Sequence, residues 1–181
     1  MGIVQRYLKA FQIILSYGPD AVSVEDQLTG FLNRRVFDEL IKSEARQADI
    51  QDRSFIIILA DVDDLKWVND NLGHEKGDEV IQETANFLRK SCRSTDLFCR
   101  YGGDEFLICL TRIKKEKVDK IKEMMYIFLS SPKEVSFSFG IAIWRKGCTI
   151  ENLIKEADKK MYKQKKLKKE KKRNGRIVGA K

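Results

Sequence analysis

The feature that most restricts the fold is a pair of adjacent glycines between two strand-like segments. Gly102 and Gly103 lie between residues 96–100 and residues 105–110, and both flanking segments have the composition of strands. Paired glycines adopt positive φ at little cost, so a pair in this position predicts a tight antiparallel hairpin. Asp104 and Glu105 follow the glycines directly, so the turn also presents carboxylates.

The rest of the chain mixes helical and strand-like patterns without strict βαβ alternation. Hydrophobic periodicity predicts helices for residues 28–47, 64–72, 77–92, 114–129 and 150–167, and further strands for residues 55–62, 135–144 and 176–178. Thr29 or Asn33 is available near the start of the first helix, and Asp63 can cap the second. This mixture favours an α+β fold, in which a central, mainly antiparallel sheet is flanked by helices.

The first 20 residues have a pattern of their own. Their apolar side chains are spaced three, four and three residues apart, at Val4, Tyr7, Phe11 and Ile14. This spacing is typical of a helix that pairs with another helix, and Gly18-Pro19 ends it. We therefore expect residues 1–20 to form a short N-terminal helix or linker, either the end of a longer signalling helix or a helix packed on the domain. Residues 21–181 are expected to form one domain.

The net charge of +8 is concentrated at the C-terminal end of the chain. Residues 155–181 contain 13 Lys or Arg against 3 acidic residues, whereas the remainder is nearly neutral. A basic segment of this kind suits the phosphates of a small ligand, an acidic membrane surface or nucleic acid, or is simply a solvated helix face. Nucleic acid is not expected as a partner, because aromatic interleaving and a recognisable nucleic-acid-binding fold are both missing.

Composition also bears on the cellular compartment. The 4 cysteines form no C-x-x-C pair, which indicates reduced thiols packed in a core. The longest apolar run, residues 55–60, is far shorter than the roughly 20 residues that span a bilayer. Because no secretory signal is visible either, we expect a cytoplasmic protein, or the cytoplasmic domain of a larger, membrane-anchored one.

A second acidic position lies at the end of the strand predicted for residues 55–62. Taken alone, Asp61 and Asp63 are explained as well by a helix cap plus a surface acid as by a functional site. If the hairpin lies beside this strand, however, carboxylates converge from two different elements. Converging carboxylates repel unless cations lie between them, and Mg²⁺ favours a few carboxylates together with substrate phosphates. The pattern therefore predicts metal-assisted phosphoryl transfer on a nucleoside triphosphate.

Five segments together resemble the GGDEF domain, the diguanylate cyclase family. The signature stands at residues 100–106 as Arg-Tyr-Gly-Gly-Asp-Glu-Phe, and the other family motifs follow the expected order at residues 26–35, 61–78, 138–142 and 157–162. The resemblance covers about residues 26–169. It implies a nucleotide-cyclase, palm-like fold and identifies residues 21–181 as a GGDEF catalytic domain.

This resemblance implies that two GTP molecules are joined into cyclic di-GMP with loss of two pyrophosphates. Two Mg²⁺ or Mn²⁺ ions per active site would be held by Asp61, the backbone carbonyl of Val62, and Asp104. Asp104 would also be the base that takes the proton from the attacking 3′ hydroxyl. Adjacent strand residues point to opposite faces, so periodicity alone leaves open whether Asp104 or Glu105 meets the metal.

The resemblance also assigns the contacts to the nucleotide. Asn69 and Asp78 would read the guanine edge, although each has a helix cap as its alternative role. His74, the only histidine, is expected at the same pocket, with a purely structural role as the alternative. The triphosphate would be contacted by Lys66, Lys165 and Lys169, while Gly102 and Gly103 would let the main chain pass close to the nucleotide.

The chain departs from the family at its C-terminal end. The family's tail often reads Gly-Arg-Asn where Lys168, Lys169 and Glu170 stand here. Lys169 would keep the charge of the family's arginine but would lose its bidentate geometry.

Regulation is implied by the same resemblance. Arg93 and Asp96 stand at the spacing of the family's product-inhibition site, although an i,i+3 charge pair near a helix end is common by itself. Because the product has twofold symmetry, catalysis would need a homodimer with one GTP in each domain. A sensor domain upstream of the N-terminal helix would then supply the input signal. The alternative function is a catalytically silent module that holds GTP or cyclic di-GMP as a receptor.

Overall fold

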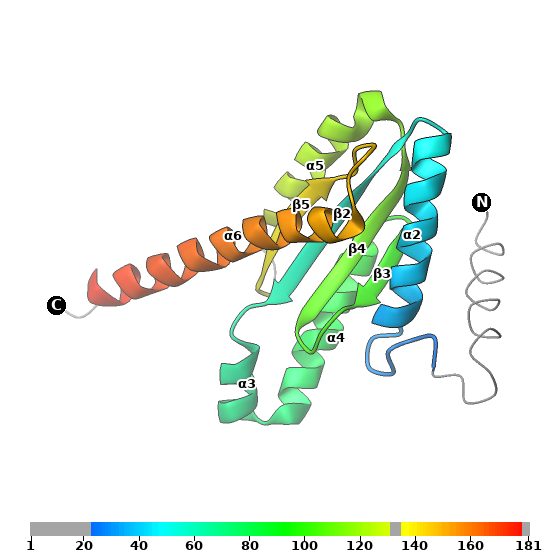
Figure 1. The fold of residues 1–181 in the computed structure, drawn as a ribbon. Coiled ribbons are helices and arrows are strands. Elements are labelled where there is room, and N and C mark those ends of the chain that lie inside the picture. Colours follow the sequence, from blue (N-terminus) through cyan, green and yellow to red (C-terminus); the bar gives the residue numbers. More distant parts are fainter. Residues whose placement is uncertain (1–22, 131–134, 179–181) are drawn as a thin grey trace.

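The computed structural model describes residues 23–130 and 135–178, with side chains up to residue 172 (Figure 1). The helix predicted for residues 1–20 lies outside the described residues. Within the described ranges, no helix is both long and apolar enough to cross a lipid bilayer.

The centre of the fold is a five-stranded sheet in the order β1-β3-β4-β2-β5 (Figure 1). Its strands are β1 (Leu32–Asn33), β2 (Ser54–Val62), β3 (Leu97–Arg100), β4 (Glu105–Ile113) and β5 (Phe137–Ile143). β2 pairs antiparallel with both β4 and β5, and only the short β1 runs parallel to its neighbour β3. The predicted α+β class with a mainly antiparallel sheet is therefore confirmed.

Helices cover both faces of this sheet. The helices are α2 (Arg34–Ile50), α3 (Leu65–Leu72), α4 (His74–Lys90), α5 (Val118–Ser130) and α6 (Ile150–Val178), with a 3-10 turn η1 (Lys115–Lys117) before α5. α3 lies beyond the end of the sheet and packs on α4, whereas the others lie on the faces of the sheet (Figure 1). Side chains of β2 alternate between two cores, as the period of two in a strand requires. Ile56 and Ile58 pack in the core that contains α4 and α5, whereas Ile57 and Leu59 pack in the core that contains α2 and α6.

The first helix starts later than the sequence predicts. α2 begins at Arg34, and Asn33 is its N-cap, since the Asn33 side chain accepts a hydrogen bond from the amide of Val36 at 3.0 Å. Residues 28–33 form a turn and β1 instead of helix. The reason is local: the Asp26 carboxylate accepts hydrogen bonds from both the amide and the hydroxyl of Thr29, at 3.0 and 2.8 Å.

Two other expectations about element ends are wrong. Residues 176–178 are the end of α6 and not a strand, because the lysine-rich stretch before them contains strong helix formers and no proline. Asp63 does not cap α3, whose N-cap is Asp64 in a left-handed conformation with φ of 58° and no capping bond from its side chain. The Asp63 carboxylate is engaged by Ser136 and Ser138 instead.

Candidate functional site

The hairpin turn is fixed to the end of β2. Asp61 pairs with Glu105 in the β2–β4 register, and one residue further the amide of Val62 donates to the Asp104 carbonyl at 3.0 Å. The turn is also held from within, because Arg100 donates to the Gly103 carbonyl at 2.8 Å and forms an ion pair with Asp26 at 3.2 Å. The predicted convergence of the hairpin and the strand that carries Asp61 is therefore confirmed.

The role expected of the two glycines needs a correction. Neither Gly102 nor Gly103 has a positive φ, so backbone conformation is not what makes glycine suitable in this turn. A side chain at Gly102 would instead approach the Glu105 carboxylate, with the added Cβ at 3.0 Å from Oε2. Gly103 faces open space, since nothing lies within 4 Å of the position of its Cβ. The pair thus leaves one side of the turn uncovered.

The electrostatics of this corner are dominated by acids. Asp61 is buried, and burial together with the nearby charges of Asp104 and Asp63 raises its pKa, despite the opposing effect of Lys165. Glu105 is half-buried, and burial together with Asp61 and Asp104 raises its pKa too. A cation placed among these carboxylates would relieve their mutual repulsion.

Hard oxygen donors are available here for such a cation. No cluster of three or more His, Cys, Asp and Glu side chains able to hold a metal ion occurs in the described part of the chain. The residues expected to hold Mg²⁺ are Asp61 and Val62 at the end of β2 and Asp104 in the turn bonded to it. Their oxygen atoms are the kind of donor that Mg²⁺ prefers, and their role as metal ligands stays a prediction.

α6 faces this acidic segment with a row of lysines. Lys165 Nζ donates to Asp61 Oδ1 at 2.5 Å, Lys168 Nζ to Asp63 Oδ2 at 2.7 Å, and Lys172 Nζ to Asp64 Oδ2 at 2.5 Å. We call these three residues the lysine row. Their spacing of three and four places them on one side of the helix. The pKa of Lys165 is raised, because the hydrogen bond and the charges of the acids outweigh the effect of burial.

Sequence reasoning found only the first member of this row. Lys169, expected at the triphosphate, is exposed on α6, and its role stays a prediction. Lys168 and Lys172 were not predicted as part of the site. Three lysines at i, i+3 and i+7, in a chain that also has acids at residues 61, 63 and 64, form a pattern that could have indicated them. The predicted helix ended at residue 167 and so excluded both.

The α3–α4 pair carries the residues expected at the base. Asn69 and Asp78 lie inside α3 and α4, so neither caps a helix. Asn69 packs directly against the glycine at position 77, where an added Cβ would lie 1.8 Å from Asn69 Oδ1. Gly73, with φ of 88°, makes the sharp connection between the two helices. His74 and Asp78 are exposed, as is Lys66, which is expected at the triphosphate and not at the base.

All of these elements meet at one end of the sheet. β2 leads directly into α3, and the hairpin turn is bonded to the last residue of β2, so α3 and the β3–β4 turn lie at the same end of the sheet (Figure 1). The lysine row is bonded to residues 61, 63 and 64 at that same end. The family model for the diguanylate cyclase GGDEF domain matches residues 23–171 of the sequence. The chain belongs to the GGDEF family.

Curated relatives of this GGDEF domain are named as cyclases and as a response regulator. The chain is 29% identical to the probable diguanylate cyclase DgcJ of Escherichia coli over 166 residues, which is 90% of this chain and 32% of the relative. It is 34% identical to the response regulator PleD of Caulobacter vibrioides over 152 residues, which is 78% of this chain and 34% of the relative. The chain therefore spans about a third of the length of these relatives.

Solved structures share the fold. The GGDEF domain of DgcB from Caulobacter crescentus, in complex with c-di-GMP, superimposes with a TM-score of 0.69 at 25% identity, covering 80% of this chain and 91% of that one. The diguanylate cyclase SiaD of Pseudomonas aeruginosa, in complex with its activator SiaC, gives a TM-score of 0.70 at 28% identity, covering 91% of this chain and 66% of that one. The predicted GGDEF fold is thereby confirmed.

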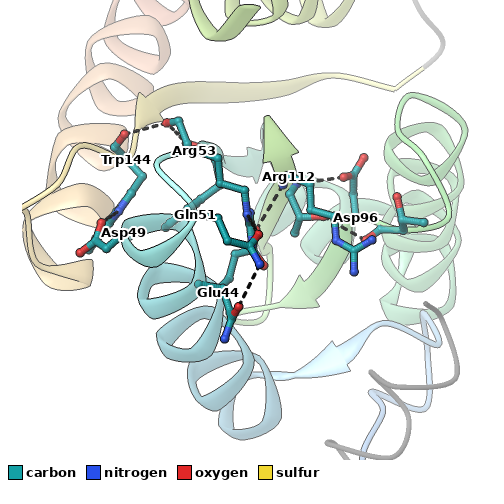
Figure 2. A network of polar contacts seen from close by, with 12 residues as sticks. Glu44, Asp49, Gln51, Arg53, Asp96, Arg112 and Trp144 are labelled. Carbon is teal, nitrogen blue, oxygen red and sulfur yellow. Dashed lines mark hydrogen bonds and ion pairs between the residues drawn. The ribbon is translucent and has the colours of Figure 1, made fainter. Parts of the chain in front are cut away.

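The expected inhibitory pair of this GGDEF domain lies away from the hairpin turn. The Asp96 side chain is buried and accepts hydrogen bonds from the amide of Thr111 at 3.0 Å and from the amide of Arg93 at 2.9 Å (Figure 2). Nearby, the Glu44 carboxylate pairs with Arg53 and accepts the amide of Arg112 at 3.2 Å. Asp96 therefore ties β4 to the turn before β3, whereas the Arg93 residue is exposed.

Proposed function

We propose that this GGDEF domain is a diguanylate cyclase, which condenses two GTP molecules into cyclic di-GMP and two pyrophosphates. The observation that carries the proposal is the contact between the Val62 amide and the Asp104 carbonyl, which brings the strand end with Asp61 and the signature turn together. In each of two equivalent steps a 3′ hydroxyl attacks the α-phosphorus of the other GTP, and pyrophosphate leaves.

The acids at the turn are proposed to serve both metal binding and proton transfer. Asp61, the Val62 carbonyl and Asp104 would hold two Mg²⁺ or Mn²⁺ ions, which neutralise triphosphate charge and help to activate the hydroxyl. Asp104 would accept the proton of the attacking hydroxyl. The open space around the Cβ position of the neighbouring Gly103 supports access of a nucleotide to this carboxylate.

The base and the phosphates are proposed to be bound on either side of this turn. Asn69 and Asp78 would pair with guanine, because an amide and a carboxylate together offer the donor and acceptors that its edge requires. The close packing against position 77 fixes the Asn69 side chain for this role. His74 would lie at the same pocket. Mobile charges for the triphosphate would come from Lys66, Lys165 and Lys169.

Catalysis is proposed to require two copies of the domain. Each copy holds one GTP, and the twofold product forms only where two such sites face each other. Bringing the copies together then controls the rate. A sensor domain upstream, acting through residues 1–20, would supply that control.

Incubation of a dimeric sample with GTP and Mg²⁺ tests the cyclase proposal. Nucleotide chromatography is expected to show cyclic di-GMP with two pyrophosphates released per product, and chelation of Mg²⁺ with EDTA is expected to abolish both. A dimeric sample that binds GTP with Mg²⁺ present and releases no product would instead identify a receptor and would overturn the proposal.

Feedback by the product is proposed to act through Arg93 and Asp96. Arg93→Ala is expected to weaken inhibition by cyclic di-GMP at least about tenfold while the initial rate is unchanged, because an exposed guanidinium is suited to bidentate contacts with a phosphate or guanine. Initial rates measured against added cyclic di-GMP give this result directly.

Lys90→Ala is the control for Arg93→Ala, since it removes an exposed positive charge nearby at the end of α4. It is expected to leave the inhibition constant unchanged. If Arg93→Ala and Lys90→Ala are inhibited as strongly as the unmodified chain, Arg93 does not bind the product.

A further inference from the structure

The last turns of α6 contact the segment that carries the expected metal ligands. All three members of the lysine row donate to carboxylates of residues 61–64, which join β2 to α3. The helix continues through this region to Val178. Lys168 therefore stands in a stretch, residues 168–170, where the family's tail often reads Gly-Arg-Asn.

Asp63 is the best-anchored residue of the segment. Its carboxylate accepts hydrogen bonds from Ser136 Oγ at 2.7 Å, Ser138 Oγ at 2.6 Å and Lys168 Nζ at 2.7 Å. Its amide donates to the Ser136 carbonyl at 2.9 Å. The Asp63 side chain is 8% exposed, so its charge depends on these partners rather than on water.

Lys168 joins three elements through one ammonium group. Besides Asp63, Lys168 Nζ donates to the Phe137 carbonyl at the start of β5 at 2.7 Å. A single side chain of α6 thus ties the edge strand to the segment after β2. Lys172 is different, because its pair with Asp64 is exposed on both sides, at 61% and 47%. Exposed ion pairs of that kind contribute little.

We propose that Lys168 is a positioning residue, which holds Asp63 so that the neighbouring Asp61 and the Val62 carbonyl are presented to a divalent cation. The inference rests on the proposed function of this segment as the metal site. Lys168 itself touches neither metal nor nucleotide in this role. Partners that orient the ligands of a metal are commonly worth about 10–100-fold in metal affinity.

Mn²⁺ binding separates positioning from simple electrostatics. Removal of a positive charge near a cation site strengthens cation binding if only the charge matters. Removal of an orienting contact weakens it. For Lys168→Met we expect the Mn²⁺ affinity, measured by electron paramagnetic resonance with a non-hydrolysable GTP analogue present, to fall about tenfold, and Lys168→Arg to recover a large part of the loss.

Lys172→Met is the matched control. It removes the same charge, one helical turn further along α6, from an exposed pair with the same segment. Its Mn²⁺ affinity is expected to equal or slightly exceed that of the unmodified chain. Thermal melting of both variants verifies that they are folded. Mn²⁺ affinity in folded Lys168→Met that equals or exceeds that of Lys172→Met would overturn the proposal.

The result is distinguishable from a failure of the cyclase proposal, because binding of Mn²⁺ with the analogue needs no turnover. If the unmodified chain forms no cyclic di-GMP and Lys168→Met still lowers the Mn²⁺ affinity, the positioning role is supported although the cyclase proposal fails. If the unmodified chain forms cyclic di-GMP and Lys168→Met keeps the full Mn²⁺ affinity, the cyclase proposal is supported and the positioning role of Lys168 is wrong.

Discussion

Asp104→Asn is expected to reduce the rate of cyclic di-GMP formation by at least about a thousandfold, since it removes both a metal ligand and the general base. The substitution keeps the shape of the side chain. It also keeps the contact with Val62, which uses the backbone carbonyl of Asp104 and not its carboxylate. A loss of activity would therefore report the chemistry of the carboxylate, and initial rates with GTP and Mg²⁺ measure it.

Glu105→Gln is the control for this prediction. Glu105 is the β4 residue in register with Asp61, and its side chain lies close to Gly102. We expect Glu105→Gln to retain more than about a tenth of the rate, because in our assignment Glu105 shapes the turn and does not take the proton. An inactive Glu105→Gln beside an active Asp104→Asn would reverse the assignment of the two acids.

Gly140→Ala is expected to destabilise the domain by about 2–3 kcal/mol, which lowers the melting temperature by roughly 4–12 °C. Gly140 lies in β5 beneath α6, and an added Cβ would lie 1.9 Å from the Ala157 carbonyl oxygen and 2.6 Å from the Met161 amide nitrogen. Both atoms belong to backbone, so relief requires movement of the helix itself. Calorimetry or a circular dichroism melt measures the effect.

Gly103→Ala is the matched control for stability. Its added Cβ meets nothing within 4 Å, and the backbone there has no positive φ that would disfavour alanine. We expect its melting temperature to stay within about 2 °C of the unmodified chain. Equal stability of Gly140→Ala and Gly103→Ala would mean that α6 does not rest on β5 as closely as described.

Strand periodicity predicted β2, β3, β4 and β5 of the described sheet, but it missed the short β1 and added a false strand at residues 176–178. The apolar run at residues 55–62 predicted a strand and the glycine pair predicted a hairpin, whereas the pairing of β2 with β4, which places Asp61 beside the turn, is seen only in the structure. Apolar runs and glycine pairs are short-range patterns, so one sequence is enough to detect them. Lys165 came from the family resemblance instead, and the resemblance did not show that it contacts Asp61.

The errors arose where tertiary contacts competed with local preference. Asp63 has the chemistry of a helix cap, yet two serines from β5 and its approach, together with Lys168, occupy its carboxylate. The Asp63 partners are 73, 75 and 105 residues away in the sequence, so no local window contained that information. The first helix is a different case, because Asp26 binds Thr29, only three residues away, and folds residues 28–33 into a turn that apolar spacing alone assigns to helix.

The two halves of the proposed feedback site differ in how freely they can change during evolution. Asp96 holds two backbone amides in a buried position, so its loss leaves buried donors without partners and costs stability as well as any ligand contact. Arg93 is exposed, so its replacement affects the ligand alone. Descendants of this chain that escape feedback are therefore expected to have changed Arg93 first and to have kept Asp96 as a relic of the site.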